Sequence, residues 1–281
     1  MSQTASPSLW QRLQQIPRGY VYALLAAVVV WQLVWPIRLP IAPSTPTDGV
    51  FDAIRAVPND KLIIISADWD ASTQAETGPQ TTAIMHAIFR AKRKFALLNL
   101  ATPAGVKLAN DRAVAVAKQY GARYGVDWCN WGYKYGGSNV VIGLAKNIQA
   151  AIQTDHDGTP VEKLPMMAGV KDVHDIGLVI EVSGSQMTEL WLQFFQGTYG
   201  TPLANAVTAV MAPGYYPYLD SHQLQGMLVG AKGAAEMEAL LRSPGQGYAI
   251  MSAQSWAHVL ILLLIVVGNL GYLLARKGER R

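Results

Sequence analysis

The feature that most constrains this chain is an apolar run near its C-terminus, Ala257–Ala275, which contains no Lys, Arg, Asp or Glu. About 20 consecutive apolar residues are enough for a helix to cross the hydrocarbon core of a bilayer. Arg276 and Lys277 follow this run directly and would lie at the membrane surface. The sequence therefore predicts a transmembrane helix over residues 256–275, and the lipid bilayer is the first predicted partner.

A second apolar segment, Tyr20–Trp35, lies near the N-terminus and is interrupted only by Gln32. It is short for a span, although Ile37 and its neighbours extend it. A cleaved signal peptide is the alternative interpretation, because basic residues precede the apolar run. The following residues, 36–40, contain two prolines and an arginine and no small-x-small cleavage site. We therefore expect an uncleaved transmembrane helix over residues 19–37.

The basic residues are concentrated at the two ends of the chain. Residues 1–38 and 276–281 hold seven of the 23 Lys and Arg residues and only one of the 19 acids. By the positive-inside rule, the tails 1–18 and 276–281 are cytoplasmic and the central part is extracytoplasmic. The remaining 16 basic and 18 acidic residues nearly balance. The net charge of +4 therefore gives no indication of nucleic acid as a partner.

Each apolar segment carries an amide, Gln32 in the first and Asn269 in the second. They lie at different depths, roughly 18 Å and roughly 9 Å from the cytoplasmic ends of their helices. Amides in lipid hydrogen-bond to neighbouring helices, and Gly268 and Gly271 permit close helix approach. We expect a homo-oligomer or a complex with other membrane subunits. The alternative is that each amide bonds its own backbone or reaches an interface.

Between the spans, predicted strands and helices alternate. Prolines in residues 38–58 predict a stiff, extended stalk. The domain proper covers 59–243, and 244–255 form a linker. Continuous apolar strands predict one parallel sheet of about five strands with flanking helices, either Rossmann-like or flavodoxin-like. We expect strands at 61–66, 95–101, 126–131, 176–182 and 203–210, and helices at 77–94, 102–124, 138–152, 186–195 and 220–241.

Polar side chains follow several of these strands. The carboxyl ends of parallel strands meet at one rim, where ligands of such sheets bind. A serine pair at 183–185 leads into a predicted helix, whose N-terminus attracts anions. The alternative is that these residues form turns and helix caps. The residues that we predict to contact a ligand are Asp68, Asp70, Ser72, Lys134, Ser183, Ser185 and Tyr215.

The sharpest pattern is Asp68-Trp69-Asp70 directly after the first strand, with Thr102 after the second. It resembles the first two motifs of haloacid-dehalogenase-like phosphohydrolases. The resemblance implies Asp68 as nucleophile, Asp70 as acid/base, Thr102 as a phosphate ligand and Mg²⁺ as cofactor. Two departures stand against it. Ser72 replaces the usual threonine, and the predicted fourth strand offers only Glu181 instead of an acidic pair.

The longest irregular stretch, 154–175, also contains residue types that bind metals. Its spacing matches no zinc or calcium pattern, so an ordinary polar loop is the alternative. Cys129 is the only cysteine, which excludes an intrachain disulfide. A P-loop, a G-x-G-x-x-G turn and a G-x-S-x-G motif are absent from the sequence. The possible metal ligands are Asp155, His156, Asp157, His174 and Asp175.

These observations favour a binding or accessory subunit over an enzyme. The extracytoplasmic domain would bind a ligand or partner, and the two spans would hold it in a membrane assembly. The alternative is a Mg²⁺-dependent hydrolase that uses Asp68 and Asp70. No other cofactor is indicated.

Overall fold

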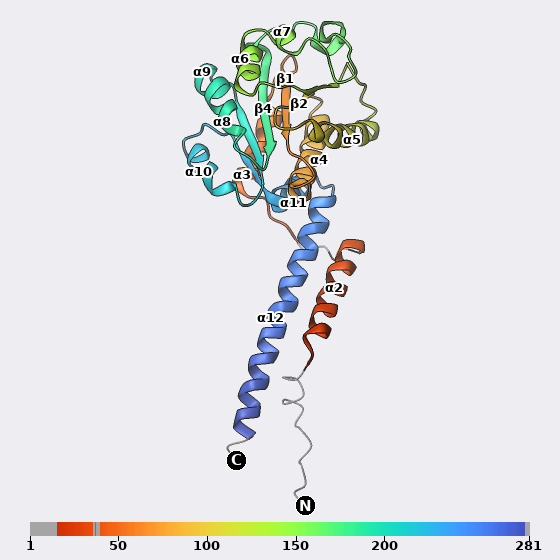
Figure 1. The fold of residues 1–281 in the computed structure, drawn as a ribbon, viewed down its shortest axis with the longest axis vertical. Coiled ribbons are helices and arrows are strands. Elements are labelled where there is room, and N and C mark those ends of the chain that lie inside the picture. The colour runs from red at the N-terminus through yellow and green to blue at the C-terminus, as the bar shows by residue number, and fades with distance from the viewer. Residues whose placement is uncertain (1–15, 36, 38–39, 279–281) are drawn as a thin grey trace, which may run out of the picture. The chain divides into compact units, whose positions relative to one another are not determined.

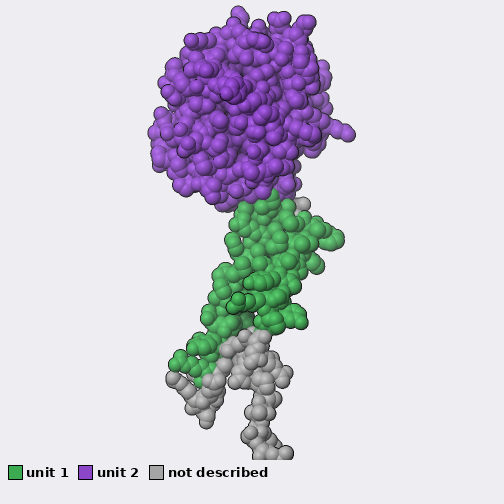
Figure 2. Space-filling view, viewed as in Figure 1, with its two compact units in different colours: residues 1–40, 249–281 green, residues 41–248 purple. Residues whose placement is uncertain are grey.

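The computed structural model describes residues 16–35, 37 and 40–278. The chain divides into two compact units (Figure 2), and each is described by itself. One comprises residues 1–40 and 249–281, and the other comprises residues 41–248. The predictions for the N-terminal tail before residue 16, for Arg38 and for the last three residues lie outside the described residues.

The larger unit is built on one six-stranded sheet in which every pair of neighbouring strands is parallel (Figure 1). The strand order is β3-β2-β1-β4-β5-β6. This is the doubly wound, Rossmann-like order, so the flavodoxin-like alternative is wrong. The order in which strands are added reverses between β1 and β4: β2 and β3 lie on one side of β1, and β4, β5 and β6 lie on the other. The strands are β1 Leu62–Asp68, β2 Lys94–Asn99, β3 Trp128–Tyr133, β4 Ile176–Ser183, β5 Leu203–Val207 and β6 Met227–Val229.

Helices cover both faces of the sheet. Strand residues alternate between two buried clusters, so that Ile63 packs under one helical layer and Ile64 under the other. One layer contains α3 Thr45–Ala56, α4 Gln74–Arg90, α5 Pro103–Tyr120 and α11 Gly230–Leu240. The opposite layer contains α6 Ser138–Lys146, α7 Ile148–Ile152, α8 Thr188–Trp191 and α10 Ala212–Asp220.

The sixth strand corrects the expectation of five. We expected a strand over 203–210 and one helix over 220–241, whereas β5 ends at Val207 and β6 precedes α11. Glycines spaced along 226–233 resemble a helix face, which hides this short strand. Gly226 serves close packing on α3, since an added Cβ would lie 2.3 Å from the backbone nitrogen of Val50.

The predicted stalk is also corrected, because most of it is the helix α3. Pro46 lies in the first turn, where its missing N–H has no helical partner to lose. Val50 and Ile54 lie four residues apart and are fully buried. Thr47 Oγ1 donates to Glu236 Oε2 on α11 at 2.6 Å. The helix is therefore an integral part of the α/β unit.

Two predicted helices have different bounds for identifiable reasons. α4 begins at Gln74, three residues before the start that we expected, and Gln80 lies inside it without a capping role. Gln80 instead donates from Nε2 to the carbonyl oxygens of Val207 and Gly230, both at 3.0 Å. The predicted helix over 138–152 is two helices, because Asn147 caps α7 with a bond from the amide of Ala150.

The predicted helix over 186–195 is likewise broken. Four residues of α8 are followed by a π-helical turn, Leu192–Gln196, and by α9, Gly197–Tyr199. π-Helical turns occur often at functional sites. Tyr215 lies in the helix α10, Ala212–Asp220, a segment for most of which we expected no helix or strand.

The smaller unit consists of helices. α12, Gln246–Gly278, begins in the α/β unit, and its apolar stretch Gln246–Leu274 is long and apolar enough to cross a membrane. α2, Arg18–Val34, is apolar but shorter, with 17 residues.

The amides and glycines of these two helices are placed differently. Gln32 is buried, and its Oε1 accepts a hydrogen bond from the backbone amide of Ile37 at 2.8 Å. This bond is of the kind described by the alternative in which the amide bonds the backbone of its own segment. Gly268 and Asn269 are exposed, and Gly271 is buried. Among the described residues, no atom from outside its own stretch of helix lies within 4 Å of a Cβ built on Gly268, so another helix could approach there.

Candidate functional site

The two strands at the centre of the sheet end in polar residues that the sequence had singled out. Asp68 ends β1 and Ser183 ends β4, and the two are register partners. The crevice between the first strands on either side of the reversal is where doubly wound sheets bind ligands. The fold thus brings together Asp68 and Ser183 at the position that we predicted for a site.

Asp68 is held by three hydrogen bonds and is only 3% exposed. Its Oδ2 accepts from Ser66 Oγ at 2.5 Å. Its Oδ1 accepts from the backbone amides of Leu100 (2.5 Å) and Ala101 (3.0 Å), just beyond β2. Burial raises the pKa of Asp68 to about 6, and the three hydrogen bonds oppose that rise. The carboxylate therefore joins the ends of β1 and β2.

Asp70 has separate partners. Its Oδ1 accepts from the amide and the hydroxyl of Ser72, at 2.8 and 2.6 Å. These bonds lower the pKa of Asp70. Such a bond to the backbone two residues on is an Asx turn, which stabilises the loop itself. In the described part of the chain, no group of three or more His, Cys, Asp or Glu side chains is placed to hold a metal ion.

Thr102 and Asn99 organise the loop after β2. Thr102 is the N-cap of α5, and its Oγ1 accepts from the amide of Ala104 at 3.3 Å. Asn99 Oδ1 accepts from the amides of Ala101 and Thr102, and its Nδ2 donates to Ala67 O. Our sequence reasoning missed Asn99, although an amide at the end of an apolar strand was a readable signal.

The loop between β1 and α4 contains no glycine, and it packs tightly on the loop after β4. A Cβ built on Gly184 would lie 2.6 Å from Cγ2 of Thr73 and 3.3 Å from Cγ2 of Thr208. Glu76 stands in the first turn of α4 and accepts from the amide of Ala209 at 2.8 Å. Dinucleotide-binding loops need glycine so that the pyrophosphate can approach the backbone. This loop lacks that glycine and carries an acid in the first helical turn.

A row of buried polar residues crosses the middle of the sheet. Ser66 on β1 pairs with Glu181 on β4, which pairs with Asn205 on β5. All three are fully buried. By strand alternation they lie on the same face as Asp68 and Ser183.

Glu181 is only partly satisfied in this row. Its Oε2 accepts from Thr188 Oγ1 on α8 at 2.5 Å, whereas its Oε1 has no partner. Both polar side-chain atoms of Asn205 also have none. Burial, followed by the nearby Asp68, raises the pKa of Glu181 to about 8. The sequence shows these two polar residues inside apolar strands, but only the register shows that they are neighbours.

Three of the residues that we predicted to contact a ligand, Ser183, Ser185 and Tyr215, lie together. Ser183 Oγ donates to Ser185 O at 3.0 Å, and the hydroxyl of Tyr215 reaches the same carbonyl at 3.3 Å. Ser185 Oγ is buried and has no partner. Burial raises the pKa of Tyr215 to about 12. The anion site expected here would have had α8 as its helix, but α8 is only four residues long.

Lys134 lies elsewhere, after the edge strand β3. Its Nζ donates to Thr154 O in the long loop at 3.0 Å. In the same loop, Asp155 is buried and accepts from Tyr124 OH and from the amides of Asp157 and Thr159. Lys134 and Asp155 thus stabilise the loop's own conformation.

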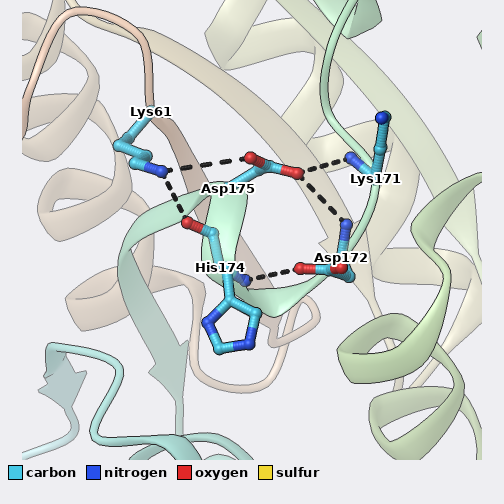
Figure 3. Close-up of polar contacts among 5 residues, drawn as sticks. All are labelled: Lys61, Lys171, Asp172, His174 and Asp175. Carbon is cyan, nitrogen blue, oxygen red and sulfur yellow. Dashed lines mark hydrogen bonds and ion pairs between the residues drawn. The ribbon is translucent and has the colours of Figure 1, made fainter.

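Two more of the possible metal ligands, His174 and Asp175, lie where the long loop joins β4 (Figure 3). Asp175 Oδ2 accepts from the amides of Lys171 (2.8 Å) and Asp172 (3.3 Å). Lys61 lies 3.9 Å from Asp175 Oδ1 and donates to His174 O at 2.7 Å. Asp172 Oδ1 accepts from the amide of His174, which completes a capping box. The carboxylates of Asp172 and Asp175 therefore stabilise a turn of the loop.

Taken together, the strand order and the rim define a Rossmann-like α/β unit followed by an apolar helix of membrane-spanning length. Comparison of the chain with protein-family models, with curated proteins and with solved structures finds no match. The function is therefore inferred from the geometry of the site.

Proposed function

We propose that this chain is a membrane-anchored protein whose extracytoplasmic α/β unit binds a ligand or partner as an accessory subunit of a membrane assembly. Two features support this proposal. The α/β unit is followed directly by an apolar helix of 29 residues. The rim of its sheet gathers Asp68, Ser183, Ser185 and Tyr215, and the buried hydroxyl of Ser185 has no hydrogen-bond partner among the described residues.

The observation that carries the choice of binding over catalysis is the state of Asp68. A nucleophilic carboxylate needs a free oxygen that the substrate can reach. Asp68 is 3% exposed, and both of its oxygens accept hydrogen bonds. Asp70 is bound to Ser72 in a separate turn. The hydrolase alternative therefore has less support than binding.

The hydrolase alternative is tested by assaying the purified full-length chain for phosphatase activity with and without Mg²⁺. We expect no activity above that of a mock preparation. Activity that needs Mg²⁺ and is lost in both Asp68→Asn and Asp70→Asn would replace the binding proposal.

The proposed topology has two spans and both termini in the cytoplasm. The proposal is supported through the positive-inside rule by Arg18, the first residue of α2, and by Arg276 and Lys277 at the end of α12. The only native cysteine, Cys129, is fully buried, so an introduced cysteine can be labelled selectively.

Single cysteines report the topology in intact cells treated with a membrane-impermeant maleimide. Val210→Cys, at a position that is 83% exposed, should be labelled from outside. Ser2→Cys should react only after permeabilisation. Labelling of both positions in intact cells would contradict the two-pass arrangement.

The subunit role is tested by extraction in a mild detergent, native sizing and identification of the copurifying chains. We expect a particle larger than one chain and its detergent. A monomer that purifies without a partner would contradict the assembly, while leaving the topology intact.

A further inference from the structure

Glu181 stands out because it is a fully buried carboxyl group with one unpartnered oxygen. Its neighbours across the sheet are Ser66 on β1 and Asn205 on β5. Above it, Thr188 of α8 donates to Oε2. An ionised carboxyl in an apolar interior is costly unless it is paired or well hydrogen-bonded.

No cation compensates this group among the described residues. None of the ion pairs found there includes Glu181 or Asp68. The titratable groups that act on this region are all acidic or phenolic: Asp68 from β1, Glu189 from α8 and Tyr215 from α10. Removing the proton from Glu181 therefore places a second negative charge beside Asp68.

Asn205 provides a partner for a protonated Glu181. A carboxylic acid donates one O–H bond, and that bond needs an acceptor. Asn205 is fully buried, lies beside Glu181 on the next strand, and has a side-chain oxygen without a partner. Glu181 Oε1 and the Asn205 amide can therefore satisfy each other after a small shift, or through one buried water.

We propose that Glu181 is a buried proton-binding site that keeps the rim of the sheet closed. With its proton, Glu181 bonds toward Asn205 and leaves Asp68 as the only charge of the pair. When the proton is released to solvent, Glu181 and Asp68 repel each other, and the loops 69–73 and 184–187 separate. This proposal concerns closure of the rim and is independent of which molecule the rim binds.

The loops are linked to Glu181 by direct contacts. Thr188 opens α8, the helix that follows the β4 loop, and it is bonded to Glu181. Gly184 in that loop packs on Thr73 of the β1 loop. The π-helical turn after α8 is a helix irregularity of a kind that is frequent at functional sites. Loss of the Glu181 proton therefore acts on both loops through α8 and Gly184.

Hydrogen–deuterium exchange of the full-length chain in a mild detergent tests the proposal between about pH 6 and pH 9, with rates corrected for intrinsic exchange. In the wild type, peptides covering 66–75 and 181–190 should lose about tenfold or more of their protection over this range. Glu181→Gln, which resembles the protonated acid, should keep its protection. Glu162→Gln, at an exposed position outside both peptides, should behave as the wild type.

A second variant tests the same site without removing the carboxyl group. Thr188→Val removes the hydroxyl that stabilises the ionised form, so the midpoint of the protection loss should move to higher pH. This variant also decides the question if Glu181→Gln fails to fold.

Three results would overturn the proposal. The first is a wild type whose protection does not change with pH. The second is an equal loss of protection in a folded Glu181→Gln or, if that variant does not fold, an unchanged midpoint in Thr188→Val. The third is a protection that changes with the sodium concentration at fixed pH, because Glu181 would then bind a metal cation instead of a proton.

Discussion

The buried carboxyl pair leads to a prediction about stability that differs from the behaviour of most proteins. The pKa of Glu181 is raised from 4.5 to about 8, chiefly by burial. Between these values the folded chain holds a proton that the unfolded chain has lost. The folded state binds more protons, so the free energy of unfolding must fall as pH rises. The stabilisation is complete below the unfolded pKa and is lost as pH passes through the folded pKa.

The size of the effect follows from linkage. One proton bound only by the folded state changes the free energy of unfolding by up to ~1.4 kcal/mol per pH unit. From pH 6 to pH 8, Glu181 alone should therefore cost about 2 kcal/mol. Asp68, with a pKa raised from 3.8 to about 6, acts in the same direction below pH 6. Because an unfolding free energy is commonly about 5–15 kcal/mol, a change of this size is easily measured.

Denaturant unfolding of the full-length chain in a mild detergent, followed by tryptophan fluorescence, measures this change from about pH 6 to pH 8. Glu181→Gln should remove the slope over this range. Asp70→Asn is the matched control and should keep the wild-type slope, because the pKa of Asp70 is lowered instead of raised. A wild type that gains stability from pH 6 to pH 8, or a Glu181→Gln variant that keeps the slope, would refute the assignment of the proton to Glu181.

Three further substitutions test the packing that positions the site. Gln80→Leu removes the side-chain N–H donor that bonds carbonyl oxygens at the ends of β5 and β6. We expect the free energy of unfolding, measured with denaturant, to fall by about 2–4 kcal/mol. The control Gln193→Leu, at an exposed position, should show no measurable change. Gly105→Ala places a Cβ 2.1 Å from Trp69 O and should markedly lower the melting temperature, whereas Gly214→Ala, which meets no atom within 4 Å, should leave it unchanged or raise it. Asp68→Asn replaces one of the two accepting oxygens of Asp68 by an NH₂ group, so that one oxygen is left to accept the bonds that two oxygens accept in the wild type. We expect about 1–3 kcal/mol of destabilisation in denaturant unfolding. Unchanged stability would mean that these bonds contribute little.

The elements that were predicted correctly carry their signal locally. β1 and β4 are predominantly apolar and buried, as strands of a sheet covered on both faces are, and β1 begins with the continuous apolar run Leu62–Ile65. α12 is predicted by length and apolar composition alone. β6 has only three residues, and it forms a strand because it pairs with β5. Helix α10 separates the two strands in the sequence, so the pairing has no local signal. Prolines suggested extended chain before β1, but Pro46 in a first turn is compatible with a helix.

The position of the candidate site on the sheet could be predicted from the sequence, but the hydrogen-bond partners of its residues could not. Asp68 follows a buried strand, so its place at the rim could be read from the sequence. Its partners Leu100 and Ala101 follow β2, and the choice of β2 as neighbour depends on strand order. Glu181 and Asn205 are 24 positions apart in the chain and become neighbours only through the register of β4 and β5. Sequence patterns do not contain this register.

The two buried carboxyl groups have different environments, and this difference assigns the shared proton. Asp68 accepts three hydrogen bonds, two of them from backbone amides, which favour the ionised form. Glu181 accepts a hydrogen bond from Thr188 and none from a backbone amide, and its burial and the nearby Asp68 favour the protonated form. If the proton were instead on Asp68, a carboxylic acid would face three donors while a poorly bonded carboxylate remained buried beside Asn205. The charge therefore belongs on Asp68, where it joins β1 to β2, and the exchangeable proton belongs on Glu181, where it controls the junction of β4 with β5 and α8.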